Sequence, residues 1–323
     1  MLLEKGYEVY GLVRRKANQI YPNIEHIRDQ IHLLEGDLTE ESRIFEIIRD
    51  FNFDEVYNLA AQSFVPYSWK NPIYTANVNA LGCLRLLEAI RIFSPDTKFL
   101  QASSSEMFGK VYRVPQSELS YHHPRSPYGC SKSFAFNITR NYRESFDLFA
   151  CNSICFNHES ERRGLEFVTR KITYGVAKIH LGLSDKIVLG NLNAKRDWGY
   201  AQDYVKAMYL MMHYKIPDDW VIATGESHSV KEFCKIAFKC IGIDIEWQGT
   251  GVKTVGKDVK SGKILVKSSP KLWRPAEVDR LCGDSSKAKT LLGWKPQTSF
   301  EEMIQKMVEH DIRLLREEKC KLK

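Results

Sequence analysis

Residues 98–106 read Lys98-Phe-Leu-Gln-Ala-Ser-Ser-Ser-Glu106, an apolar run that ends in four polar residues. The apolar part predicts a short buried strand, and Ser103 to Glu106 mark where it ends. Further along, Ser126-Pro-Tyr-Gly-Cys-Ser-Lys132 begins with a serine and a proline, which are typical of a helix N-terminus. A strand, a polar strand end and a helix, in this order, form the repeating unit of proteins with a parallel sheet.

The same alternation runs through the first half of the chain. Short apolar runs are separated by stretches with apolar residues at three- and four-residue intervals, the spacing of an amphipathic helix. This pattern predicts an α/β fold with a Rossmann-like, doubly wound parallel sheet, in which ligands bind at the carboxyl ends of the strands. The expected strands are Glu8–Val13, Ile31–Leu34, Glu55–Ala60, Lys98–Ala102 and Phe149–Phe156, and the expected helices are Glu40–Phe51, Tyr74–Ile92 and Tyr128–Phe146.

The beginning of the chain lacks the first parts of a dinucleotide-binding sheet. Met1-Leu-Leu-Glu-Lys-Gly6 has the pattern of a last helical turn with a glycine cap, and a strand follows at once. Such a sheet normally opens with a strand and a glycine-rich turn, because bare backbone must approach the pyrophosphate. We therefore expect a sheet without its first strand and glycine-rich turn. Either the true start lies upstream of Met1, or this chain has lost both.

The second half of the chain alternates less regularly. It contains proline and glycine turns, a polar loop at Glu159–Gly164 and a helix from about Phe300 to Lys319. We expect a nucleotide-binding domain at 1–156 and, at 157–323, a smaller α/β substrate-binding lobe that is partly interleaved with it.

Composition restricts the class of protein. With 323 residues, 43% of them hydrophobic, the chain can bury a sizeable core, and its net charge of +7 is spread along its length. We interpret the Lys-rich stretch from Lys253 to Lys271 as a solvated loop rather than a nucleic-acid surface. No segment reaches the roughly 18 apolar residues that span a membrane. The eight cysteines lack metal-binding spacing, so we expect a cytoplasmic protein without metal, membrane or nucleic-acid partners.

Tyr128 and Lys132 are the first candidates for catalysis. A phenol, with an ordinary pKa of about 10, can take a proton from an alcohol only if a nearby cation stabilises the phenolate, and a lysine one helical turn away supplies that cation. The spacing alone is weak evidence, because Tyr174 and Lys178 repeat it on what we interpret as an ordinary amphipathic helix face. Tyr128 differs because the serine-rich strand end precedes it.

Glu106 adds a second base to this group. An alcohol dehydrogenase of this kind needs a serine or threonine, the tyrosine and the lysine, but no carboxylate. A carboxylate here could remove the proton next to a newly formed ketone, and water would then leave from the next carbon. A structural ion pair between Glu106 and a nearby arginine or lysine is equally consistent with the sequence.

Other strand ends suggest a dinucleotide. Arg14 and Arg15 directly follow a strand, where two guanidinium groups favour a ribose 2′-phosphate and hence NADP over NAD, although a surface basic pair is the alternative. Asp37 could accept a bond from the adenine amine, but Gly-Asp after a strand is also simply a turn. The small and amide residues from Asn58 to Ser63 would allow the backbone to pass close beneath a nicotinamide. Tight packing is the alternative explanation for them.

Nine segments, distributed from end to end, match the motifs of one family. They are Val9–Arg15, Glu35–Thr39, Tyr57–Ser63, Gln101–Gly109, Ser126–Lys132, Asn157–Ser160 with Arg162–Gly164, Phe167–Ile172, Lys195–Tyr200 and Arg274–Asp279. Asn157-His-Glu-Ser160 and Lys195-Arg-Asp-Trp-Gly-Tyr200 are far more specific than the tyrosine and lysine spacing. With these residues the chain resembles the GDP-mannose 4,6-dehydratases of the extended short-chain dehydrogenase/reductase superfamily.

The resemblance implies a redox-neutral dehydration of GDP-mannose to GDP-4-dehydro-6-deoxy-D-mannose. Tyr128, aided by Lys132, would deprotonate the 4-hydroxyl while hydride passes from C4 to bound NADP+, and Ser104 would hydrogen-bond that oxygen. Glu106 would then remove the C5 proton, the C6 hydroxyl would leave as water, and hydride would return to C6. The resemblance also implies a homo-oligomer, either a dimer or a tetramer.

Binding residues follow from the same resemblance. The positively charged residues among the substrate contacts given below could bind the GDP diphosphate. The implied cofactor contacts are Arg14, Arg15, Lys16, Ala17, Asp37, Leu38, Leu59, Ala60, Ala61, Gln62, Ser63, Tyr74, Lys132, His158 and Arg163. The implied substrate contacts are Asn157, Lys171, Arg196, Arg274 and Glu277.

The chain also departs from the family pattern. Ser104 stands where the family usually has threonine, which removes a methyl group that restricts the rotamer. Phe64 replaces a common histidine, Glu161 replaces a proline, and Lys16-Ala17 replaces two serines that help to contact phosphate and build a tetramer interface. Two alternatives therefore remain open: a catalytically impaired nucleotide-sugar-binding relative, and a dehydratase or epimerase that acts on another nucleotide sugar.

Overall fold

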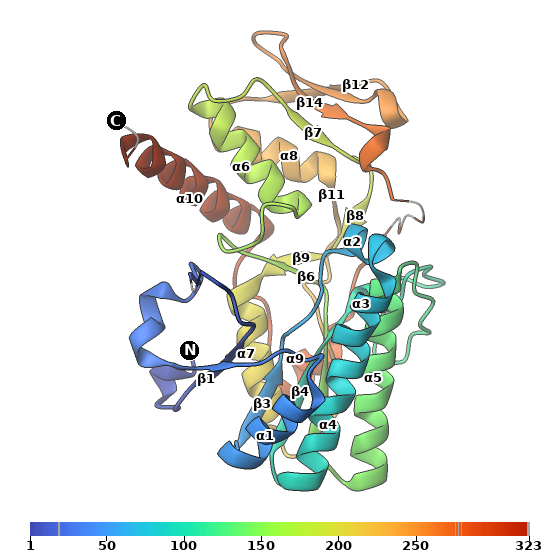
Figure 1. Ribbon diagram of the computed structural model, residues 1–323. Helices are drawn as coiled ribbons and strands as arrows, with labels where there is room; N and C mark the ends of the chain where they lie inside the picture. The colour runs from blue at the N-terminus through green and yellow to red at the C-terminus, as the bar shows by residue number, and fades with distance from the viewer. Residues whose placement is uncertain (19, 275, 277, 279, 322–323) are drawn as a thin grey trace.

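The computed structural model describes residues 1–18, 20–274, 276, 278 and 280–321 (Figure 1). Its first four-stranded sheet is parallel, in the order β10-β5-β4-β3. β3 (Glu55–Asn58), β4 (Lys98–Ser104) and β5 (Ala150–Cys155) come from the first half of the chain, whereas β10 (Asp219–Ile222) comes from the second. The polar ends of β3 and β4 therefore lie at one edge of the sheet, as the sequence predicts.

Helices cover both faces of this sheet. Side chains of β4 alternate between the two faces, since Phe99 is buried in one apolar cluster and Leu100 in another. The predicted doubly wound α/β arrangement is confirmed. Helices of the first face are α1 (Glu41–Phe51), α4 (Gly82–Phe93) and α5 (Pro127–Phe146), and those of the second are α7 (Ala201–Met212) and α9 (Ser286–Leu292).

The first two strands form a separate parallel pair. β1 (Tyr10–Val13) pairs with β2 (His32–Glu35), and among the described residues neither strand is hydrogen-bonded to the four-stranded sheet. Ahead of β1, a 3-10 turn at Leu3–Lys5 ends at Gly6, which has a φ of 81° and donates its N–H to the carbonyl of Leu3. The glycine-capped helical turn is therefore present as predicted. The expected lack of a first strand and a glycine-rich turn stays a prediction.

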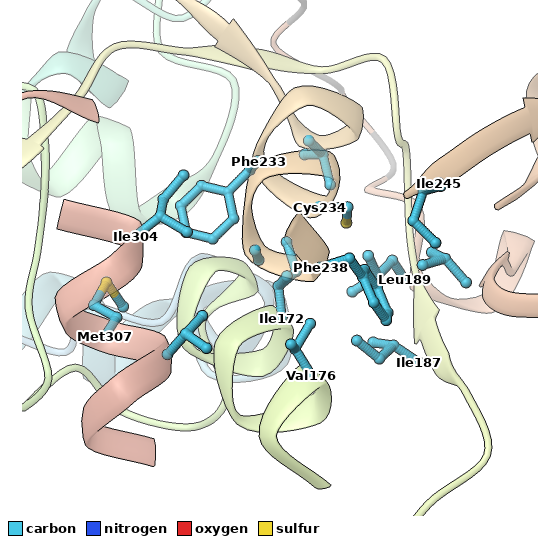
Figure 2. Packing of buried hydrophobic residues seen from close by; sticks show 14 of the residues in the cluster. Ile172, Val176, Ile187, Leu189, Phe233, Cys234, Phe238, Ile245, Ile304 and Met307 are labelled. Carbon is cyan, nitrogen blue, oxygen red and sulfur yellow. The ribbon is translucent and has the colours of Figure 1, made fainter. Parts of the chain in front are cut away.

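A second core lies between a second sheet and three helices (Figure 2). Ile172 and Val176, Phe233 and Phe238, and Ile304 and Met307 meet there from the three helices. The sheet has the strand order β12-β13-β14-β7. The elements are α6 (Val168–His180), β7 (Ile187–Leu189), α8 (Val230–Lys239), β12 (Ile245–Gln248), β13 (Val255–Asp258), β14 (Ile264–Ser268) and α10 (Phe300–Lys321).

The Lys-rich stretch from Lys253 to Lys271 is not the solvated loop that we expected. Its strands β13 and β14 pair antiparallel, and Leu265 and Val266 are buried in the second core while Lys267 stays exposed. The sequence interpretation was wrong because the short apolar run is hidden among lysines, whose exposed side chains do not prevent strand pairing.

Other expectations about local structure agree with the fold. The helix predicted at Tyr74–Ile92 begins at α3 (Pro72–Ala76) and continues through a π-helical turn at Asn77–Leu81 into α4. Tyr174 and Lys178 lie on α6, where the Lys178 ammonium is 4.9 Å from the ring centre. Five of the eight cysteines are buried. Within the described part of the chain, each helix is too short or too polar to cross a membrane.

Asp219 anchors β10 to the helix on the first face of the sheet. It is 3% exposed and accepts hydrogen bonds from Arg140 and Arg143 of α5 and from Asn152 of β5. The neighbouring Asp218 is more exposed and pairs with Lys287 at 2.6 Å.

Replacing Asp219 should therefore destabilise the fold. We expect Asp219→Asn to lower the free energy of unfolding by about 2–3 kcal/mol, because two guanidinium groups lose a buried charge partner. The matched variant Asp218→Asn should cost less than about 1 kcal/mol, because that pair is partly exposed. Urea unfolding measures both, and equal losses would contradict this account of β10.

Candidate active site

Helix α5 begins beside the end of β4, as the sequence predicts. The Ser126 hydroxyl accepts the Gly129 N–H at 3.0 Å, and Pro127 occupies the first turn. A Cβ at Gly129 would lie 2.7 Å from the Glu106 carbonyl oxygen, so only glycine allows this close approach. The helix start thereby brings Tyr128 and the strand end together.

Tyr128 is buried among groups with opposing effects on its phenol. Burial raises the pKa of Tyr128 to about 12, and the Glu106 carboxylate adds to this rise. A hydrogen bond with Ser104 and the Arg163 guanidinium lower the pKa. Among the described residues, Arg163 is thus a cation that lowers the pKa of this phenol, an effect that the tyrosine and lysine spacing did not reveal.

Lys132 points toward the sheet. Its ammonium donates a hydrogen bond to the Ala102 carbonyl of β4 at 2.7 Å. Burial lowers the pKa of Lys132 to about 8. Direct stabilisation of the phenolate by Lys132 stays a prediction.

Glu106 occupies a short 3-10 turn that follows β4. The Ser104 hydroxyl accepts the Glu106 N–H at 3.2 Å and so fixes this turn. The Glu106 side chain is 11% exposed, and its carboxylate lies 3.2 Å from Arg274 Nη1 and 3.9 Å from Arg196 Nε. Burial opposes ionisation, but the two guanidinium groups overcome it and hold the pKa of Glu106 below its ordinary value. Glu106 is thus charged near neutral pH, as a general base must be, and it also makes the ion pair that the sequence left open.

The substrate residues implied by the family resemblance come from the second half of the chain. Arg196 ends β8 (Lys195–Arg196) and donates to the Val278 carbonyl at 2.7 Å. Asn157 lies opposite Trp198 where β6 (Asn157–Glu159) pairs with β9 (Trp198–Tyr200), between the two sheets (Figure 1). Burial lowers the pKa of Lys171 on α6. The structure thus gathers Arg196 and Arg274 at Glu106, whereas Glu277 lies outside the described residues.

A cavity of about 830 Å³ lies at the ends of β1, β2 and β3. Arg14 donates to the Tyr74 hydroxyl at 2.9 Å across it. The Asp37 carboxylate accepts the N–H and hydroxyl of Thr39, so it does form the turn that was the alternative to adenine binding. The cavity brings together Arg14, Asp37, Leu38, Ala60, Ala61, Gln62, Ser63 and Tyr74 from the cofactor set, whereas Arg15, Lys16, Ala17 and Leu59 are not in its wall.

The lining of this cavity fits the adenosine half of a dinucleotide. A guanidinium and a phenol are joined on one side, a carboxylate lies at a strand end, and small residues expose backbone. These groups suit a ribose phosphate and a base. They do not replace a glycine-rich turn for the pyrophosphate.

Two further members of the cofactor set are His158 and Arg163. His158 is hydrogen-bonded through Nδ1 to the Phe156 carbonyl oxygen at 2.9 Å and is stacked on Tyr204, and burial lowers the pKa of His158 to about 4. It is therefore neutral. Arg163 lies 3.6 Å over the Phe167 ring and forms an ion pair with Glu159 at 3.3 Å.

The sequence analysis missed Asn79. This side chain is 2% exposed, accepts the Gln62 N–H at 2.8 Å and donates to the Gln62 carbonyl and the Ser131 hydroxyl. It ties the backbone along the cavity to α5. A usable signal was its position between the apolar residues Val78 and Ala80 on a helix.

Known families provide a close match to the sequence. A family model described as GDP-mannose 4,6 dehydratase matches residues 1–307. The GDP-mannose 4,6 dehydratase of Cricetulus griseus is 49% identical, over 98% of this chain and 87% of its own length. The GDP-mannose 4,6-dehydratase of Yersinia enterocolitica is 46% identical, over 96% of this chain and 89% of its own length.

Solved structures match the fold. DesIV, a dTDP-glucose 4,6-dehydratase from Streptomyces venezuelae with NAD and TYD bound, has a TM-score of 0.81 at 20% identity and covers 98% of this chain and 92% of its own. RMD from Pseudomonas aeruginosa, complexed with NADPH, has a TM-score of 0.75 at 20% identity and covers 90% of this chain and 95% of its own. At these identities the likeness concerns the α/β fold alone.

Lys132 should make the fold less stable near neutral pH. Because its pKa in the folded chain, about 8, lies below its ordinary value of 10.5, burying the charged form costs stability. The cost is complete below pH 8 and disappears above pH 10.5.

Replacing this lysine should relieve that cost. We expect Lys132→Met to raise the free energy of unfolding at pH 7 by about 1–2 kcal/mol, after allowing for the lost bond to Ala102. Urea unfolding of both proteins from pH 7 to 10.5 measures the difference, which should shrink as the pH rises. A difference that does not depend on pH would contradict this account.

Proposed function

The chain belongs to the GDP-mannose 4,6-dehydratase family, and we propose that it converts GDP-mannose to GDP-4-dehydro-6-deoxy-D-mannose without net redox change. The observation that best supports this reaction is the ionised Glu106 beside Tyr128 and Ser104. An enzyme that only oxidised an alcohol would need Ser104, Tyr128 and Lys132. A buried charged carboxylate is costly to maintain, so its presence favours a reaction that needs a second base.

We propose NADP as the cofactor. When bound, NADP+ accepts a hydride from C4 of the sugar and returns it to C6. Arg14, Asp37 and Tyr74 would hold its adenosine end, together with Arg15, Lys16 and Ala17 after β1. The backbone from 59 to 63 would lie along the nicotinamide half, with Lys132, His158 and Arg163 opposite.

Tyr128 is the proposed base for the mannosyl 4-hydroxyl. Its phenolate would take the hydroxyl proton while Ser104 donates a hydrogen bond to the same oxygen. The phenol must ionise far below its pKa of about 12 in this structure, and cationic charge nearby favours that ionisation. Two residues can supply this positive charge: Arg163, and Lys132, which lies one helical turn from Tyr128.

Glu106 is the proposed base for C5. Once C4 is a ketone, the C5 proton is acidic and Glu106 can remove it; the electron pair then forms the C5–C6 double bond as the C6–O bond breaks. The protonated Glu106 can give its proton to the departing hydroxyl, which leaves as water. When C6 receives the hydride, C5 takes up one proton, and this uptake balances the proton that Tyr128 accepted from the 4-hydroxyl. Arg196 and Arg274 are proposed to bind the GDP diphosphate, and a diphosphate that draws Arg274 away from Glu106 would make the carboxylate a stronger base.

A catalytically impaired nucleotide-sugar-binding relative is the second candidate. It is favoured by the separation of the β1–β2 pair from the four-stranded sheet among the described residues.

Turnover with a trace of cofactor separates the two candidates. With GDP-mannose and NADP+ far below the sugar concentration, we expect a product lighter by one water, in excess over the cofactor, detected by mass spectrometry. Tyr128→Phe should lower the rate by about 10²- to 10⁴-fold, because proton transfer from the 4-hydroxyl is lost. No product from protein that binds NADP+ would reject the dehydratase and leave the binding relative.

Glu106→Gln should separate oxidation from elimination. We expect this variant to oxidise C4 in part, seen as NADPH absorbance in a single turnover, and to release no water-loss product, because no base reaches C5. Glu118→Gln is the matched control, since Glu118 is a part-buried carboxylate that accepts the Val221 N–H away from the site. Normal turnover by Glu106→Gln would show that Glu106 serves only as an ion-pair partner.

A further inference from the structure

A buried ion pair links two helices of the second core. Arg170 of α6 is 6% exposed and Asp311 of α10 is fully buried. The Arg170 Nε and Nη2 atoms lie 2.7 and 2.6 Å from Asp311 Oδ1, and the Thr173 hydroxyl donates to Asp311 Oδ2 at 2.7 Å. Two nitrogens of the guanidinium are thus directed at α10.

The third nitrogen of Arg170 is directed at the loop that follows β6. Its Nη1 donates to the backbone carbonyl of Arg163 at 2.9 Å and to that of Glu161. Only the planar fork of an arginine can serve a carboxylate and two carbonyls in these directions at once, because lysine has a single nitrogen. The Arg163 N–H in turn donates to the Ser160 carbonyl at 3.0 Å, so this loop is closed on itself and held from one side by Arg170.

The loop carries Arg163, whose positive charge lowers the pKa of Tyr128. Arg163 lies over the Phe167 ring and beside Glu159, which is 1% exposed and accepts the Thr169 hydroxyl at 2.6 Å. These contacts fix the guanidinium, whereas Arg170 fixes the backbone from which it extends. A shift of that backbone would move the cation away from the phenol.

We propose that Asp311 and Arg170 are positioning residues of the active site, which hold the loop at 160–164 and with it the Arg163 guanidinium between Phe167 and Glu159. This inference deepens the proposed function and rests on it. A buried ion pair adds little net stability compared with apolar side chains of the same size. Apolar residues, including Met307, Val308 and Leu315, occupy the same face of α10, so stability alone does not call for Asp311 there.

Arg170→Lys and Asp311→Asn test the proposal in the protein without ligands. Arg170→Lys keeps the charge opposite Asp311 but loses the bonds to the two carbonyls. Amide hydrogen exchange, followed by mass spectrometry over 160–167, should become about tenfold faster or more in both variants. Asp219→Asn is the matched control, because it breaks a comparable buried pair whose partners lie on α5 and β5 and should leave this exchange unchanged.

Cofactor affinity and the pH dependence of turnover report on the active site itself. NADPH fluorescence should show weaker binding to Arg170→Lys than to Asp219→Asn. The rise of the rate with pH should move to higher pH, because a displaced Arg163 no longer favours the phenolate. The other ionisable groups that affect the pKa of Tyr128, namely Glu106 and the Cys155 thiol, are unchanged in both variants, as is Lys132 one helical turn away.

The outcomes separate this inference from the proposed function. Unchanged exchange over 160–167 in Arg170→Lys, with a lower melting temperature like that of the control, would overturn the positioning role. Because exchange needs neither cofactor nor substrate, it decides the inference even if the chain fails to dehydrate GDP-mannose. If Asp311→Asn does not fold, Thr173→Val replaces it, because this variant removes one hydrogen bond to Asp311. Thr173→Val should give a smaller increase in the exchange over 160–167. No increase in either Thr173→Val or Arg170→Lys would reject the proposal.

Discussion

A carboxylate can stay charged inside a protein only if cations surround it, and this constraint organises the site around Glu106. The penalty for burying such an ion is several kcal/mol, so partners must be in place when the chain folds. The partners of Glu106 are Arg196 and Arg274, which lie far along the sequence in the second half of the chain. Their ion pairs join the end of β4 to segments from the second half of the chain.

The phenol of Tyr128 is subject to the same electrostatics, but the net shift of its pKa is in the opposite direction. Burial and Glu106 raise its pKa, and Arg163 lowers it. The proposed base for the 4-hydroxyl and the proposed base for C5 therefore influence one another, since a negative Glu106 makes the phenolate harder to form. Whether Tyr128 and Glu106 can both act as bases at one pH therefore depends on the cations that loops place near them. The spacing of the tyrosine and the lysine alone does not determine it.

Sequence periodicity predicted the parts of the fold that depend on local rules. Strands β1 to β5 and helix α5 lie where apolar spacing and the Ser126-Pro127 helix start placed them, because these signals come from neighbouring residues. The gathering of Arg14, Asp37 and Ala60 at one cavity followed from the meeting of strand ends. The domain boundary at 156, homo-oligomerisation and a cytoplasmic location stay predictions.

Contacts between distant segments could not be predicted in this way. The pairing of Arg170 with Asp311 joins residues 141 positions apart. Its signal in the sequence was a charged residue on the apolar face of each helix, which indicates a buried partner without identifying it. The hairpin of β13 and β14 was missed because its lysines suggested a loop. The strands that pair with this hairpin, β12 and β7, are determined by tertiary packing.

The central claim is that Tyr128 and Glu106 act in one redox-neutral cycle on the same sugar. GDP-mannose that carries deuterium at C4 tests it most directly, with the position of the label in the product read by NMR. The account predicts that the label appears at C6 while unlabelled water is lost and NADP+ is regenerated. A labelled reduced cofactor that accumulates, with a product that has lost the label and kept its C6 hydroxyl, would contradict it.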